Sequence, residues 1–187
     1  MASPVGHSLF GLGIYSAANK QFNWKTVFIY IVLANLADFD FLFGFVVGEP
    51  NKYHHQFTHS FVMAVLIAGI FALIFCAKKG EKFLKIFGLF FSVYFSHLVI
   101  DFFAVDKSFP FGEQLLWPFT NDYYLSPLPI FMDVHKSDFS SDFVQSFFSK
   151  HNFIMVLSEI GIFGTFYLII EFIKKKLFPQ ADWKTSK

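Results

Sequence analysis

The chain has 187 residues, of which 55% are hydrophobic, 16% are charged and 31 are Phe. This length suits a single domain, and this composition is typical of a protein whose outer surface faces lipid. A net charge of +1 excludes the basic face that nucleic-acid binding requires, and a single Cys excludes both a disulfide framework and a cysteine-rich metal site.

Five helices are expected along the chain. The first covers residues 4–18, because Ser3 suits a helix N-cap and Pro4 suits the first helical position. Its length of about 22 Å leaves open whether it crosses a membrane. Four longer apolar runs follow, at roughly residues 26–47, 57–77, 83–105 and 152–173. The second of them carries no formal charge and would be about 31 Å long, which matches the hydrocarbon core. The sequence therefore predicts an all-α, polytopic integral membrane helix bundle with four to five transmembrane helices, in one domain over residues 1–187.

The segment 106–151 is not expected to cross the membrane. It contains four Pro residues, and its aromatic residues Trp117, Tyr123 and Tyr124 are of the kind that favours the bilayer interface. We interpret this segment as an interfacial lid.

The Lys residues predict an orientation. Residues 20–25, 78–85 and 174–187 carry 11 of the 15 Lys, whereas residues 48–56 and 106–151 carry the other four. The two groups of segments alternate between the four longer runs. Because Lys-rich loops stay in the cytoplasm, the lid and the histidine-rich segment are expected on the extracytoplasmic side.

Ionisable side chains interrupt the apolar runs, and their default interpretation is functional because they are expensive in a bilayer. His97 and Asp101 are four residues apart and would share one helical face. The alternative for this pair is a buried hydrogen bond that only orients helix packing. Asp38 and Asp40 interrupt the first long run, and both can serve one site only where the backbone departs from a regular helix.

His55 and His59 repeat the four-residue spacing within HHQFTHS. The alternative here is a solvated histidine cluster at the start of a helix. His54 is a weaker candidate because it would point off the shared face, and a lone helical histidine such as His7 is more often structural. Together, these imidazoles and carboxylates are the ligands of a hard or borderline divalent metal.

The predicted depths of these residues differ. Helical rise puts Asp38 and His97 about 16 Å into the membrane, whereas His55 and His59 would lie at its surface. A common site therefore requires either that the histidine-bearing helix starts deep or that residues 44–50 fold back into the protein. Glu159, inside the last run, is a candidate general base or further ligand. Two loop histidines, His135 and His151, are expected to be solvated.

The order of these elements resembles a known family. The elements are His7, ADFD at residues 37–40, HHQFTHS at 54–60, SHLVIDFF at 96–103, and Gly112 followed by LLWP. Over residues 6–118 they are similar to the LexA-regulated, membrane-bound metal-dependent hydrolases of the YdjM type. The resemblance implies the bacterial cytoplasmic (inner) membrane and metal-site roles for His7, Asp38, Asp40, His55, His59, His97 and Asp101. Ala37 and Gln56 replace the usual Pro and Arg, so the substrate or its affinity could differ. The ligand order also loosely resembles that of zinc-dependent phospholipase C.

The expected function is hydrolysis of a phosphoester on a lipid or amphiphile by a water that one or two divalent ions, expected to be zinc, activate. Asp40, Asp101 or Glu159 would orient this water or take its proton. The chain has no Arg, so metal ions or Lys would hold the phosphate. A metal transporter or a non-catalytic metal-binding protein is the alternative, and a di-iron membrane oxidase ranks last. The oligomeric state is left open.

Overall fold

The computed structural model describes residues 1–187 except 20, 81, 108–110 and 178–187. Its elements are α1 (Pro4–Ala18), α2 (Trp24–Asn35), the 3₁₀ helix η1 (Ala37–Asp40), α3 (Phe41–Val46), η2 (Pro50–Tyr53), η3 (Phe57–His59), α4 (Phe61–Lys79), α5 (Phe83–Phe102), α6 (Phe143–Ser146) and α7 (Lys150–Leu177). Across the described ranges there is no strand, only two isolated bridges. The predicted all-α class is confirmed.

Three helices are long and apolar enough to cross a membrane, namely α4, α5 and α7. A fourth span results if α2 and the η1–α3 segment are taken together, although the two parts meet at an angle of 58°. The lipid-facing sides of these helices are apolar; α4, for instance, exposes Leu66, Ile70, Leu73 and Ile74. These features confirm a helical membrane bundle.

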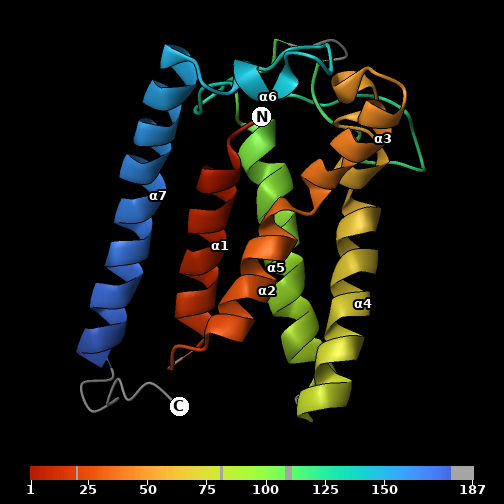
Figure 1. Ribbon diagram of the computed structural model, residues 1–187. Coiled ribbons are helices and arrows are strands. Elements are labelled where there is room, and N and C mark those ends of the chain that lie inside the picture. Colours follow the sequence, from red (N-terminus) through yellow and green to blue (C-terminus); the bar gives the residue numbers. More distant parts are fainter. Residues whose placement is uncertain (20, 81, 108–110, 178–187) are drawn as a thin grey trace.

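The helices run alternately in opposite directions (Figure 1). Helix α1 lies against α2, α5 and α7, and α4 packs on α5. The C-terminal ends of α1, α4 and α7 lie at the same end of the bundle as the beginnings of α2 and α5 (Figure 1). The Lys-rich segments therefore share one end, as predicted, although Lys20, Lys184 and Lys187 lie outside the described residues. The described part of segment 106–151, with α6, lies at the opposite end (Figure 1).

The core of the bundle is formed where α2 and α5 meet, and it includes Tyr30, Leu33, Phe90 and Val93. Helix α4 contributes a row of small residues to the core, Ala64, Ala68 and Ala72, all fully buried. Their four-residue spacing puts them on one helical face, and their size lets α4 approach α5 closely.

The N-terminus of α1 has the predicted cap. The Ser3 hydroxyl accepts hydrogen bonds from the backbone N–H groups of Val5 and Gly6. The same hydroxyl donates to Glu159 of α7, whose carboxylate also accepts from the Ser3 backbone N–H at 2.8 Å. Gly6 permits this contact, because a Cβ there would lie 2.9 Å from the Glu159 carboxylate.

The first and second long runs differ from their predicted form. The helix expected over residues 26–47 breaks at Leu36, where α2 ends. Helix α4 begins at Phe61 rather than at residue 57. Between α3 and α4 the chain turns back on itself, with Gly44 packed against the backbone carbonyls of Glu49 and Pro50. A Cβ at Gly44 would lie 2.3 Å from the Pro50 oxygen, so only glycine allows this approach. Residues 44–50 therefore fold back into the protein, which is one of the two arrangements expected to bring the histidines to the depth of Asp38 and His97.

Candidate metal centre

Four ligand atoms from three segments converge inside the bundle. They are Oδ1 of Asp38 in η1, Nε2 of His59 in η3, and Nε2 of His97 and Oδ2 of Asp101 in α5. His97 Nε2 lies 3.2 Å from His59 Nε2, 3.4 Å from Asp38 Oδ1 and 3.3 Å from Asp101 Oδ2. His59 Nε2 lies 3.6 Å from Asp38 Oδ1 and 3.9 Å from Asp101 Oδ2. Tetrahedral ligands with bonds of about 2.0–2.2 Å are about 3.3–3.6 Å apart, so this quartet fits one ion.

The quartet is buried, and three of its four carboxylate oxygens lack a hydrogen-bond donor. His59, His97 and Asp101 are at most 2% exposed, and Asp38 has 10% of its side chain exposed. Both oxygens of Asp38 and Oδ2 of Asp101 have no hydrogen-bond partner. Buried carboxylate oxygens without a partner are costly, and a divalent cation at their centre would remove that cost.

Hydrogen bonds at the outer side of each ligand fix its orientation. His97 Nδ1 donates to the Ala34 carbonyl at 2.7 Å, which leaves Nε2 free for an ion. His59 Nδ1 lies 3.2 Å from Asp40 Oδ2, which is the carboxylate–histidine arrangement found behind many metal sites. The Asp101 Oδ1 accepts from the Ala2 backbone N–H at 2.6 Å, while its Oδ2 faces the quartet.

Asp40 lies behind the quartet rather than in it. Its Oδ1 accepts from His54 Nδ1 at 2.9 Å, and its Oδ2 accepts from the Thr58 hydroxyl at 2.8 Å and the His55 backbone N–H at 3.2 Å. Three donors therefore hold this fully buried carboxylate, and His59 Nδ1, which bonds to the Thr58 hydroxyl at 3.1 Å, lies 3.2 Å from its Oδ2. The structure thus gives Asp40 contacts that orient the histidine segment, and its ligand and catalytic roles stay predictions.

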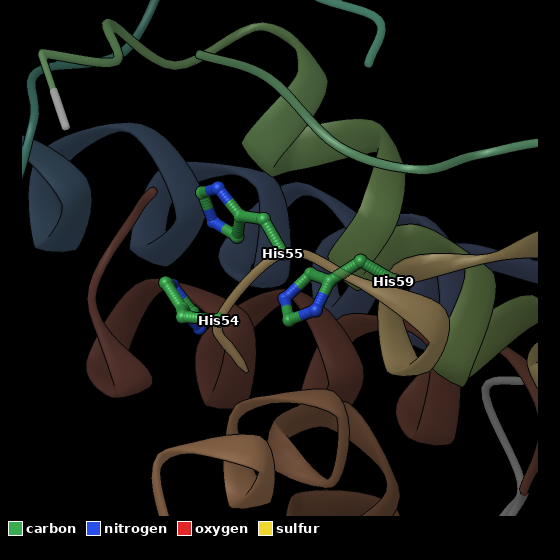
Figure 2. A group of neighbouring side chains, drawn as sticks. All are labelled: His54, His55 and His59. Carbon is green, nitrogen blue, oxygen red and sulfur yellow. The ribbon is translucent and has the colours of Figure 1, made fainter. Parts of the chain in front are cut away.

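The histidine-rich segment reaches the centre by a turn rather than by one helical face. Figure 2 shows His54, His55 and His59 gathered in this segment, with ring centroids 3.9–5.1 Å apart. His55 has a φ of 64°, a left-handed conformation that a non-glycine residue rarely adopts and that concentrates at functional sites. Its Nε2 has no hydrogen-bond partner and lies 3.8 Å from Asp101 Oδ2, so it can serve as a fifth ligand.

His54 and His7 border the centre in different ways. Both ring nitrogens of His54 have neighbours, Asp40 Oδ1 and, at 3.1 Å, the Met1 sulfur, and burial lowers the pKa of His54 well below its ordinary value. The His7 ring stacks on His97 with centroids 3.7 Å apart, and its Nε2 lies 3.3 Å from Asp101 Oδ1. Neither His7 nitrogen has a hydrogen-bond partner, but a ring stacked on His97 cannot direct a lone pair at the ion that His97 would bind, so the ligand role of His7 stays a prediction.

Glu159 and the stacked pair of His135 and His151 lie apart from the quartet. The Glu159 carboxylate is engaged with Ser3, and its catalytic role stays a prediction. His135 is half exposed, as expected, and stacks on His151 with centroids 3.6 Å apart and an angle of 5° between the rings. Both also approach Asp133. Two parallel stacked rings cannot both direct a nitrogen lone pair at one ion, so this trio does not have the geometry of a metal site.

The electrostatics of the centre favour a positive charge. Burial opposes a charge on His59, but the neighbouring carboxylates of Asp38 and Asp40 outweigh burial and raise the pKa of His59 to about 9. The carboxylates therefore draw in a cation, which is a proton on His59 where no metal binds.

Three residues near the centre were missed from the sequence. Asp106 Oδ2 lies 3.7 Å from His55 Nδ1, Glu113 is buried, and the Lys136 ammonium lies 4.9 Å from the centroid of the Phe41 ring. The signal for Glu113 was its place directly after Gly112 of the family pattern. Asp106 and Lys136 stand in the lid segment without any motif, and only the fold brings them to the centre.

The comparisons agree with the sequence resemblance. The family model described as YdjM inner membrane protein matches residues 1–178. No curated protein and no solved structure matches the chain.

Proposed function

The chain belongs to the YdjM inner membrane protein family, and from this premise we propose that it is a membrane-embedded, metal-dependent hydrolase of lipid or amphiphile phosphoesters. The observation that carries the proposal is the buried quartet of Asp38, His59, His97 and Asp101, with ligand atoms within 4.8 Å of one another. Two imidazoles and two carboxylates suit zinc. When bound, the ion would supply a water of lowered pKa and polarise the phosphoryl oxygen.

The chain's own residues would divide the remaining work. Asp38 is the most exposed member of the quartet, so we infer that substrate approaches from its side. Asp40 would hold His59 and His54 in place, and His55 would complete the coordination. Asp101, with one oxygen held by the Ala2 N–H and the other facing the quartet, is the carboxylate nearest to a role in orienting the water.

Lys136 supports a phosphate substrate. It lines a cavity of about 610 Å³ together with Lys52, Lys107 and Asp133. Burial lowers the pKa of Lys136, while the nearby carboxylates, Asp38 first among them, act in the opposite direction. Lys107 pairs with Asp133 and Lys52 with Glu49, whereas within the described residues Lys136 has no carboxylate within 4 Å. Its ammonium donates to the Met1 sulfur at 3.0 Å, a weak acceptor that a phosphoryl oxygen would replace in a chain that lacks Arg.

The orientation is part of the proposal. The Lys-rich ends of the helices lie opposite the lid (Figure 1). Under the positive-inside rule the metal centre would open toward the extracytoplasmic side. Blocking of single engineered cysteines by a membrane-impermeant thiol reagent in intact cells would test this, with Cys76 removed first.

Phosphate release and metal content test the function together. Detergent-purified protein is analysed for bound metal and incubated with mixed micelles of phosphatidic acid and of phosphodiester phospholipids. We expect about one or two zinc ions per chain, phosphoester cleavage, and loss of both in His97→Ala. Lys150→Ala, at the start of α7 and away from the quartet, is the matched control. Cleavage that persists in metal-free His97→Ala would overturn the proposal.

A metal-transport function is the second candidate, favoured by the enclosure of three of the four ligands. In that case the same residues would hold a passing ion. Zinc flux into proteoliposomes, without phosphoester cleavage, would favour transport.

A further inference from the structure

Glu113 is a buried carboxyl group that the proposed function does not yet use. It is 1% exposed, and neither of its side-chain oxygens has a hydrogen-bond partner. The other fully buried acids of the described residues are engaged: Asp40 with His54 and Thr58, Asp101 with Ala2, and Glu159 with Ser3. A carboxyl group without a partner in such a place needs an explanation.

The backbone around Glu113 is fixed against the metal centre. The next residue, Gln114, donates its N–H to the His55 carbonyl at 3.0 Å. Glu113 itself exchanges two backbone hydrogen bonds of 2.9 Å with Tyr124. Gly112, with a φ of 90°, permits this contact, because a Cβ there would lie 2.4 Å from the Tyr124 carbonyl oxygen. The Glu113 side chain therefore starts from a rigid position beside the His55 turn.

The metal centre and Glu113 act on each other electrostatically. The charges of His59, Asp101 and His97 reach the carboxyl group. Burial without a hydrogen-bond partner raises the pKa of Glu113 well above its ordinary value and so favours the neutral acid. Glu113 is not among the side chains whose ligand atoms converge within 4.8 Å. Glu113 therefore lies beside the His55 turn, outside the quartet, with its neutral form favoured by burial.

Resting on the proposed hydrolase function, we propose that Glu113 is the general acid that protonates the leaving oxygen of the phosphoester. The water oxygen forms the new bond to phosphorus, and the ester P–O bond breaks with its electron pair going to the leaving oxygen. That oxygen takes the Glu113 proton and departs as an alcohol. The proton lost by the attacking water then restores Glu113, so the net reaction consumes one water. A carboxyl group in a dry pocket beside an active centre is suited to this role.

The test compares two leaving groups in Glu113→Gln. Zinc-loaded protein is given a phosphoester with an alkyl leaving group and one with a p-nitrophenyl leaving group, which departs without protonation. We expect the variant to lose about 10²- to 10⁴-fold in kcat on the alkyl ester and little on the nitrophenyl ester. Its zinc content should stay that of the wild type. Asp122→Asn, an exposed acid that accepts a hydrogen bond from Thr120, is the control and should change neither rate.

An infrared measurement adds a readout that does not depend on turnover. The carbonyl stretch of a protonated carboxylic acid should be present in the wild type at neutral pH and lost in Glu113→Gln. Equal rate losses on both esters, no loss on either, or loss of zinc from Glu113→Gln would overturn the general-acid role and leave the hydrolase function standing. A wild-type protein that cleaves neither ester overturns the hydrolase function, and the general-acid role with it.

Discussion

The replacement Asp40→Asn separates a metal ligand from a residue that holds the ligands. In the structure, Asp40 Oδ2 accepts from Thr58 Oγ1 at 2.8 Å and from the His55 N–H at 3.2 Å, and it lies 3.2 Å from His59 Nδ1. An Asn of the same shape can keep its oxygen on the side of Thr58 and His55 and turn its NH₂ toward His54, whose ring can change tautomer. The hydrogen bonds of the side chain at position 40 are thus nearly all kept, but the negative charge behind His59 is lost.

The expected magnitude follows from this geometry. Removing a group that orients a metal ligand weakens metal affinity by about 10- to 100-fold, or about 1.4–2.8 kcal/mol. Asp38→Asn, which removes a carboxylate from the quartet itself, should weaken zinc binding by more than about 100-fold. Zinc competition with a chromophoric chelator in detergent measures both, with Asp122→Asn on the exposed surface as the control.

Two results would refute this reasoning. If Asp40→Asn weakens zinc binding as much as Asp38→Asn does, Asp40 is itself a ligand. If Asp40→Asn has the affinity of Asp122→Asn, the carboxylate behind His59 does not tune the site.

Three further results are expected. Gly44→Ala should lower the thermal midpoint and the zinc content, because its Cβ would meet backbone oxygens at a cost on the order of 1–3 kcal/mol. Gly69→Ala, whose Cβ would have nothing within 4 Å, should change neither quantity, as a thermal scan and metal analysis would show. Lys136→Met should raise KM for an anionic phosphoester about 10- to 100-fold; Lys52→Met, in the same cavity but paired, should not, and equal effects in steady-state kinetics would argue against the assignment. Chelation should lower the melting temperature of the wild type through lost binding energy but leave that of His97→Ala unchanged, and equal shifts in both would speak against the quartet as the binding site.

Local patterns predicted the parts of the site that lie within one helix. His97 and Asp101 share a face of α5 because four residues make about one helical turn, and the Ser3 cap of α1 follows from residue preference alone. The family resemblance is confirmed by the match over residues 1–178, while regulation and hydrolysis stay predictions. Helix patterns are reliable here because the apolar runs are long.

The remaining parts depend on contacts between distant segments. His55 and His59 have helical spacing, but they lie in a turn and a 3₁₀ helix, because α4 begins only at Ser60 as its N-cap. No Pro or Gly marks the helix break at Leu36 in the sequence. The break is stabilised by the contacts of Asp40 with the histidine segment. For Glu113 the sequence offered only its place after Gly112, and its position follows from the backbone bonds that it makes with Tyr124 and that Gln114 makes with His55.

The distribution of the quartet along the chain has a consequence for biogenesis. Asp38 is synthesised well before His97 and Asp101, and α4 lies between them. During membrane insertion the Asp38 carboxylate must therefore wait, protonated or close to the interface, until α5 arrives from the translocon. Under the proposed metal function, ion binding would then link segments that enter the membrane separately and would complete the assembly of the bundle.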